Sequence, residues 1–137
     1  MQSSDPSRAE VQHLEGTAWQ SSRSFSPAVV TSGGRMVWLA GQTTLVDLEG
    51  RDITGQFEPQ ARTIFALIDR TLGRLGASLQ NMVTMTVFIN DPRNGDRFVQ
   101  IRNEHFSDGK YPASALVTVS NFARPGCVIE IQGVAVI

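Results

Sequence analysis

Apolar and polar positions change their spacing several times along the chain, and each change predicts a different element. Over residues 58–75 the apolar side chains recur every three or four positions, which predicts an amphipathic helix. Pro59 suits the first turn of this helix and Gly76 suits its C-terminal cap. The predicted apolar stripe consists of Ala61, Ile64, Leu67, Ile68, Leu72 and Leu75.

A second helix is predicted from Asp96 to Ser107, and strands are indicated where β-branched and apolar residues run between turn residues. The apolar face of this helix carries Phe98, Val99, Ile101 and Phe106. The predicted strands are Ala28–Thr31, Met36–Ala40, Asn81–Ile89, Tyr111–Phe122 and Val128–Ile137. The resulting order, β-β-α-β-α-β-β, favours an α+β fold in which two helices cover one face of one sheet.

The N-terminal residues lack this patterning. Residues 1–15 are polar and are predicted to form a flexible segment, whereas residues 16–137 are predicted to form a single domain with its own core.

The last predicted strand, VIEIQGVAVI, is apolar on both of its faces, apart from Glu130 and Gln132 on one of them. Such a strand is typical of a sheet that is covered on both sides. Two helices can cover only one side, so we expect a second copy of the protein to cover the other. The alternative is a strand with a few exposed valines.

The amino-acid composition argues against several classes of function for this protein. Apolar residues make up 41% of the chain, and 12 basic against 13 acidic residues give a net charge of −1. Without a basic block, nucleic-acid binding is not expected. No apolar run is long enough for a membrane span, and the N-terminus does not resemble a signal peptide. With Cys127 as the one cysteine and two histidines, we expect a cytoplasmic protein without a metal site.

Two charged residues at apolar positions are candidates for chemistry. A carboxylate such as Glu130 on a covered strand face must be paired, hydrogen-bonded or neutral, and it could serve as a general base. The alternatives are access to water near the strand end or a structural pair with an arginine. Arg102 falls near the middle of the apolar face of the second helix. It could hold an anionic ligand, or it could reach the rim of that face or form a structural ion pair.

Other candidates carry weaker signals. Ser114 and Leu116 share one side of their predicted strand, and no acid and histidine accompany Ser114 as in a serine hydrolase. Gly41 could bring backbone N–H groups close to a ligand, and Trp19 is a candidate pocket wall. His105 is expected to be a packed or interfacial histidine.

Several stretches together resemble one family. MVWLAGQTTL, LGASLQNMVTMTVFINDP, YPASALVTVSNF and CVIEIQGVAVI are similar, in order and spacing, to the reactive-intermediate deaminase (Rid, or YjgF-like) family over about residues 16–137. The resemblance implies a chorismate-mutase-like α+β fold and a homotrimer around a central barrel, with ligand clefts between subunits. Family members hydrolyse reactive imines or enamines to carbonyl compounds and ammonia without a cofactor. The family's glutamate in the final strand corresponds to Glu130, and its cleft-lining glycine corresponds to Gly41.

One departure from the family pattern concerns substrate binding. The family's P-A-R-S segment carries an arginine that binds the substrate carboxylate, but here the segment is Pro112–Ala115, with Ser114 in the arginine's place. Trp19 corresponds loosely to the family's aromatic. We therefore predict a substrate site of Trp19, Gly41, Arg102, Ser114 and Leu116, with Glu130 catalytic and Arg102 supplying the missing charge. The alternatives are a 2-aminomuconate-type deaminase, for which Arg102, Arg124 or an arginine of a neighbouring subunit would provide cationic contacts to a dicarboxylate, and a non-catalytic small-molecule-binding trimer.

Overall fold

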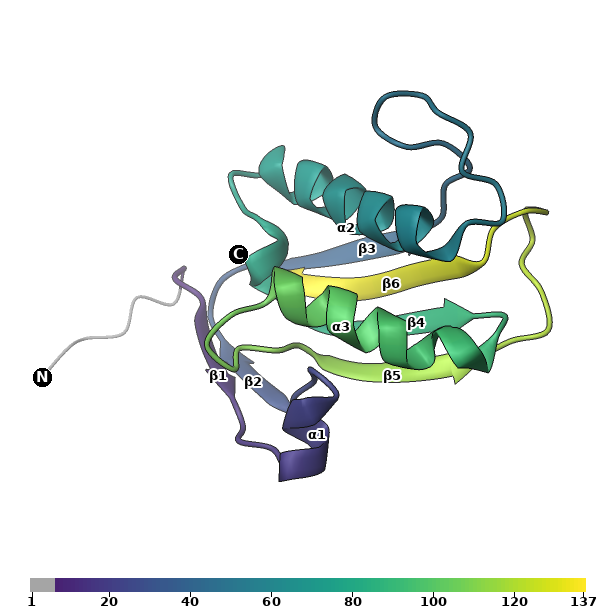
Figure 1. Ribbon diagram of the computed structural model, residues 1–137. Coiled ribbons are helices and arrows are strands. Elements are labelled where there is room, and N and C mark those ends of the chain that lie inside the picture. Colours follow the sequence, from purple (N-terminus) through teal and green to yellow (C-terminus); the bar gives the residue numbers. More distant parts are fainter. Residues whose placement is uncertain (1–6) are drawn as a thin grey trace, which may run out of the picture.

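The computed structural model describes residues 7–137, and its centre is a four-stranded sheet (Figure 1). The strands lie in the order β3, β6, β4, β5. Strand β6 is antiparallel to both of its neighbours, whereas β4 and β5 are parallel and are connected through α3. The strands are β3 (Met36–Gln42), β4 (Met82–Ile89), β5 (Ala113–Thr118) and β6 (Ile129–Val136). The predicted α+β class is confirmed.

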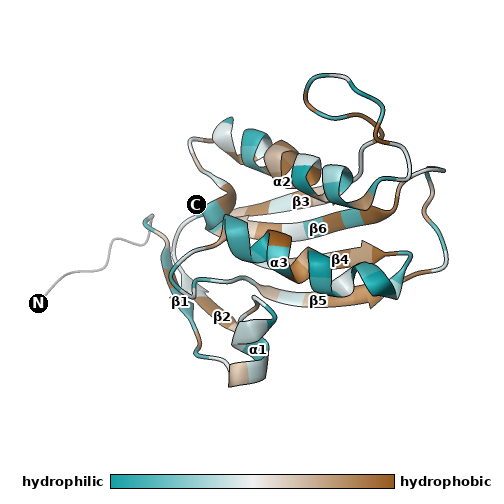
Figure 2. Ribbon diagram, viewed as in Figure 1, coloured by the Kyte–Doolittle hydropathy of each residue, from teal (hydrophilic) through white to brown (hydrophobic). Residues whose placement is uncertain are grey.

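Both long helices lie on one face of this sheet (Figure 1), as the apolar patterning predicts. They are α2 (Phe57–Gly73) and α3 (Gly95–His105), and short 3-10 helices η1 (Leu79–Asn81) and η2 (Pro92–Asn94) precede β4 and α3. The core between helices and sheet contains Ala61, Ile64, Phe65, Ile68, Leu72, Phe98, Ile101, Ile129 and Ile131. Figure 2 shows the hydrophobic strands beneath helices whose outer surfaces are largely hydrophilic.

The predicted stripe of α2 is wrong at its C-terminal end. Leu75 is 46% exposed, because the helix ends at Gly73 and the chain turns away through Gly76 at φ 75°. The amide N–H of Ala77 donates to the carbonyl of Leu72 across this turn, as in a helix cap with glycine at its centre. Phe65 is fully buried although the stripe did not include it.

The N-terminal region contains a strand that the sequence does not predict. Strand β1 (Glu10–His13) pairs antiparallel with β2 (Val29–Ser32) in a separate two-stranded sheet. Backbone pairing forms a strand at Glu10–His13, although the side chains there are too polar to signal one. The flexibility of residues 1–15 stays a prediction. The first six residues of that predicted segment lie outside the described residues. The single-domain boundary at residue 16 stays a prediction.

A short helix, α1 (Ala18–Ser22), was also missed. Its signal is a capping box: the Thr17 hydroxyl accepts from the Gln20 N–H at 3.1 Å, and the Gln20 side chain accepts from the Thr17 N–H at 2.9 Å. Among the described residues, no helix is long and apolar enough to cross a membrane.

Within residues 7–137, no helix lies over the other face of the four-stranded sheet (Figure 1). Strand register and the alternation of side chains place Trp38, Thr86, Phe88, Val117, Glu130, Gln132 and Val134 on this open face. Trp38 is 74% exposed and Val117 is 39% exposed. We refer to these seven residues as the open face. It is a largely apolar surface, and Glu130 is the acidic residue among the seven.

Gln60 is a buried amide that fastens the start of β6 to α2. Its side-chain nitrogen donates to the carbonyls of Ile53 and Gly126 at 3.0 and 2.9 Å, and its oxygen accepts from the N–H of Val128 at 2.9 Å. We expect Gln60→Met to lower the free energy of unfolding by about 2 kcal/mol, because the Val128 N–H loses its partner while the two carbonyls each keep a backbone N–H donor. Urea denaturation at fixed protein concentration measures the change. Gln100→Met, on the exposed side of α3, is the control and should change it by less than about 0.5 kcal/mol. An equal effect of both substitutions would contradict the assignment.

Candidate functional site

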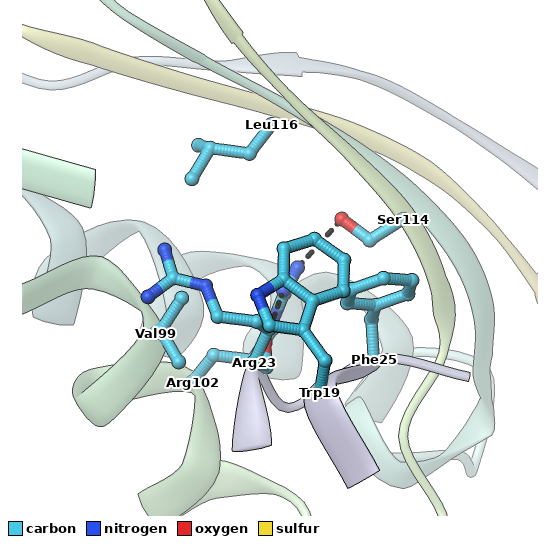
Figure 3. Close-up of a pocket in the computed structure, with 7 residues that line it drawn as sticks. All are labelled: Trp19, Arg23, Phe25, Val99, Arg102, Ser114 and Leu116. Carbon is cyan, nitrogen blue, oxygen red and sulfur yellow. Dashed lines mark hydrogen bonds between the residues drawn. The ribbon is translucent and has the colours of Figure 1, made fainter. Parts of the chain in front are cut away.

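A pocket of about 330 Å³ lies where α1, α3 and the edge strand β5 meet (Figure 3). Its volume falls in the range of small-molecule sites. Helix α3 contributes Val99 and Arg102, strand β5 contributes Ser114 and Leu116, and α1 with the residues after it contributes the rest. The lining residues are Trp19, Arg23, Phe25, Val99, Arg102, Ser114 and Leu116. The predicted substrate residues Trp19, Arg102, Ser114 and Leu116 are therefore brought together.

Two serines fasten the α1 region to the rest of the site. The Ser24 hydroxyl donates to the carbonyl of Val99 at 3.0 Å, and Ser24 itself takes a left-handed conformation at φ 55°. Ser26 bonds the chain just before β5 through its N–H to Pro112 and through its hydroxyl to Tyr111, at 3.0 and 2.6 Å. These hydrogen bonds between segments far apart in sequence position the neighbouring aromatic side chains Trp19 and Phe25.

Arg102 is 1% exposed, so it does not extend to the rim of the apolar face. Its Nε donates to the Ser24 hydroxyl at 3.3 Å. One Nη donates to the Ser114 hydroxyl at 2.6 Å and the other to the carbonyl of Arg23 at 3.0 Å (Figure 3). The guanidinium also lies 5.0 Å from the ring centre of Phe98, a cation–π contact. Among residues 7–137 no acidic side chain forms an ion pair with Arg102.

Burial of this cation has an electrostatic cost. Desolvation, with a smaller contribution from the charge of Arg23, lowers the pKa of Arg102 to about 10. Arg102 therefore remains charged at neutral pH. Arg23 itself forms an ion pair with Asp96 at 2.6 Å near the first turn of α3. The pocket thus contains two guanidinium groups, of which only Arg23 has a carboxylate partner among the described side chains.

Glu130 and Gly41 form a second group on the open face. The register of β3 against β6 shifts between Leu39 and Gln42, which turns the backbone of Gly41 toward the Glu130 side chain. A Cβ atom built on Gly41 would lie 2.7 Å from Oε2 of Glu130, so the carboxylate rests directly against bare backbone. Among the described residues no arginine, lysine or histidine is ion-paired with Glu130, which removes the structural-pair alternative within one chain.

Within one chain the two groups lie on opposite faces of the sheet. Glu130 pairs with Phe88, and Ser114 pairs with Met85, an odd number of residues away along β4. Met85 belongs to the core under the helices, so Ser114 points to the helix-covered face. The structure therefore does not bring Glu130 and Gly41 together with the Arg102 pocket in a single chain.

Sequence reasoning missed two residues of the pocket, Arg23 and Phe25. They lie in the serine-rich stretch SSRSFS, where nothing in the local pattern indicates a site. Phe25 makes an edge-to-face contact with Trp19 at 5.9 Å between ring centres. His105 stacks on Phe65 at 4.5 Å, so its predicted role as a packed histidine is confirmed. Arg124 lies exposed in the segment between β5 and β6, outside the pocket.

Metal binding finds no support in the side-chain geometry. Across residues 7–137 no group of three or more histidine, cysteine, aspartate or glutamate side chains is arranged to hold a metal ion. Cys127 is a buried free thiol.

Comparisons with known proteins agree on one family. The family model described as Endoribonuclease L-PSP matches residues 15–137. The chain is similar to Protein DfrA of Myxococcus xanthus, with 30% identity over 112 residues that cover 82% of this chain and 84% of that protein. It is also similar to the solved structure of RidA from the Antarctic bacterium Psychrobacter sp. PAMC 21119, with a TM-score of 0.64, 27% identity and coverage of 82% and 88%.

A third comparison supports the fold. The crystal structure of YyfB from Yersinia pestis, described as a protein of unknown function of the conserved Rid protein family, has a TM-score of 0.76. Identity to it is 23%, and the match covers 94% of this chain and 98% of that one.

Proposed function

The chain belongs to the Endoribonuclease L-PSP family, which includes the Rid (YjgF-like) proteins, and we propose that it is a cofactor-independent deaminase of reactive imines or enamines. The observation that carries the proposal is the position of Glu130. Its carboxylate rests against the bare backbone of Gly41, on a face that no helix of residues 7–137 covers. The proposed setting is cytoplasmic, in agreement with a buried, unpaired Cys127.

The proposed chemistry needs one positioned base. An enamine first tautomerises to the imine, whose carbon is electrophilic. Glu130 takes a proton from a water molecule as the water oxygen bonds to this carbon, and the same proton then passes to the imine nitrogen, which gives the neutral tetrahedral carbinolamine. As the C–N bond breaks, Glu130 transfers the hydroxyl proton to the departing nitrogen, so that ammonia leaves, the carbonyl forms and Glu130 is again ionised. Holding water against the carbon supplies proximity as well as general-base assistance.

We propose that a homotrimer completes the site. Glu130 and the Arg102 pocket lie on opposite faces of the sheet, so one substrate can meet both only if two chains each contribute one group. An exposed tryptophan in an apolar sheet face is typical of a surface that another subunit covers, which supports this assembly for Trp38 and its neighbours. The substrate cleft would then lie between the pocket of one chain and the open face of the next.

A 2-aminomuconate-type deaminase is the second candidate, because two guanidinium groups, those of Arg23 and Arg102, line one pocket and a dicarboxylate would suit them. A non-catalytic binding trimer would keep the pocket but would not use Glu130. The family description names an endoribonuclease, but the net charge of −1 does not favour phosphate-backbone binding. Among the described residues, five arginines are moreover ion-paired with acids, namely Arg23, Arg51, Arg62, Arg93 and Arg97.

The proposal is tested by generating 2-iminopropionate and 2-aminomuconate in situ and following ammonia release with and without the wild-type protein. We expect at least one substrate to be hydrolysed about 100-fold faster than in buffer. Faster hydrolysis of 2-aminomuconate alone would identify the pathway-specific candidate. No acceleration of either substrate, while ligands still bind, would replace the deaminase with the binding trimer.

A further inference from the structure

We propose that Arg102 is a carboxylate anchor relocated from strand β5 to helix α3, and that it acts together with the Ser114 hydroxyl and Arg23. This inference rests on the proposed function and specifies the substrate class: a carboxylate attached to a flat or apolar body. It also assigns a reason to the serine at position 114, where the resembling family has an arginine.

The charge of the pocket is the first argument. Arg102 is a buried cation that forms no ion pair among the described residues, and Arg23 adds a second cation to the same lining. Burying an uncompensated charge is costly, and the repulsion between two guanidinium groups adds to that cost. A carboxylate placed in the pocket would relieve both unfavourable interactions. A site whose role was only structural would be expected to include an acid beside Arg102.

The free hydrogen-bonding capacity of these groups is the second argument. A guanidinium has five N–H donors, and the three hydrogen bonds of Arg102 to Ser24, Ser114 and Arg23 leave two donors for a ligand. The Ser114 oxygen accepts from Arg102, so its own O–H can donate to a further acceptor. Donors that remain beside a cavity of about 330 Å³ suit the two oxygens of a carboxylate.

The contact between Arg102 and Ser114 explains why an arginine at position 102 excludes a second arginine at position 114. An Nη atom of Arg102 lies 2.6 Å from the Ser114 hydroxyl, so the first atoms of an arginine side chain at position 114 would occupy the space of this contact. Two guanidinium groups would then be crowded into one small pocket without a carboxylate between them. The arginine that anchors the carboxylate can therefore lie on α3 or on β5, but two arginines, one on each element, would be unfavourable.

The rest of the lining describes the body of the ligand. Trp19 and Phe25 form an edge-to-face aromatic pair, and Leu116 and Val99 are aliphatic (Figure 3). Aromatic and aliphatic walls favour a flat or apolar group over a polar one. The Arg23 guanidinium, although paired with Asp96, remains available for a second acceptor on a longer ligand.

The test uses a pair of probes that differ in charge and hardly in shape, phenylacetate and phenylacetamide. Binding to the full-length protein is measured by calorimetry or by NMR titration, without any turnover. We expect wild type to prefer phenylacetate, and Arg102→Met to weaken phenylacetate about 10-fold or more while phenylacetamide changes less than about 2-fold. Arg70→Met, on the exposed side of α2, is the matched control and should leave both affinities unchanged.

Moving the arginine from position 102 to position 114 should rescue phenylacetate binding. We expect Ser114→Arg alone to weaken phenylacetate binding and the double variant Arg102→Met/Ser114→Arg to restore it to within about 3-fold of wild type. If Arg102→Met does not fold by circular dichroism, Ser114→Ala takes its place and should weaken phenylacetate alone, by about 3-fold or more.

Two results would overturn the proposal: equal binding of phenylacetate and phenylacetamide by wild type, or unchanged phenylacetate binding in folded Arg102→Met. Failure of the proposed function is a separate outcome. A protein that releases no ammonia from imines but binds phenylacetate through Arg102 would keep the anchor and lose the deaminase.

Discussion

Glu130→Gln is expected to lower kcat for imine hydrolysis about 100-fold or more while the affinity for the product carboxylate changes little. The glutamine keeps the size of the side chain and its place against Gly41, but it cannot take a proton from water. General-base assistance by a positioned carboxylate typically contributes about 100-fold to 10,000-fold. The measurement is initial ammonia release at saturating substrate, together with binding of the keto-acid product.

The control for this prediction is another glutamate that is remote from both groups of site residues. Glu49→Gln, in the loop between β3 and α2, should leave kcat within about 2-fold of wild type. If Glu130→Gln kept wild-type turnover, Glu130 would not be the base, and its place on the open face would need a structural explanation. If it lost binding and turnover in equal proportion, Glu130 would contact the substrate instead of activating water.

Trp38→Asp is expected to convert the proposed trimer into monomers and to abolish turnover in the same variant. Trp38 is 74% exposed in the single chain and lies on the edge strand β3 of the open face, opposite Val134 on β6. Burial of a tryptophan at an interface removes roughly 150–250 Å² of surface from water, and an aspartate there would have to be desolvated in every copy. Molar mass is measured by light scattering after size-exclusion chromatography, and turnover is measured on the same fractions.

The matched control for Trp38 is an exposed apolar residue away from the open face. Leu48→Asp, at a position 47% exposed in the loop before α2, should leave both molar mass and turnover unchanged. The joint loss is the informative result, because a site built within one chain would survive dissociation. Monomeric wild type at working concentration would contradict the proposed assembly, and an active Trp38→Asp monomer would place the site within a single chain.

Together these substitutions separate the two groups of site residues. Glu130→Gln should remove chemistry and leave carboxylate binding, whereas Arg102→Met should remove carboxylate binding in every oligomeric state in which the chain folds. Trp38→Asp should separate the groups while leaving each group intact within its own chain. Ligand binding by the monomer would then show that the Arg102 pocket needs no second chain.

Local patterning in the sequence determined the elements of the main sheet and its helices. The three-to-four-residue spacing in α2 and α3, and the alternation in β4 and β6, specify which side of each element enters the core, because each backbone geometry has a fixed period. Element ends moved by one to a few residues, as at Leu75, since helix ends depend on caps and on the following turn. The short elements β1 and α1 were missed because their order comes from backbone pairing and a capping box.

Only the tertiary structure decided which residues from distant parts of the sequence lie next to one another. The sequence could place Arg102 in the middle of an apolar helix face, but whether it reaches water, pairs with an acid or lies buried against Ser114 depends on α1 and β5, which pack against that face from far away in the chain. Arg23 and Phe25 became part of a pocket for the same reason. Spacing along a chain reports only which side of an element a residue occupies, whereas the meeting of two elements depends on the packing of the whole core.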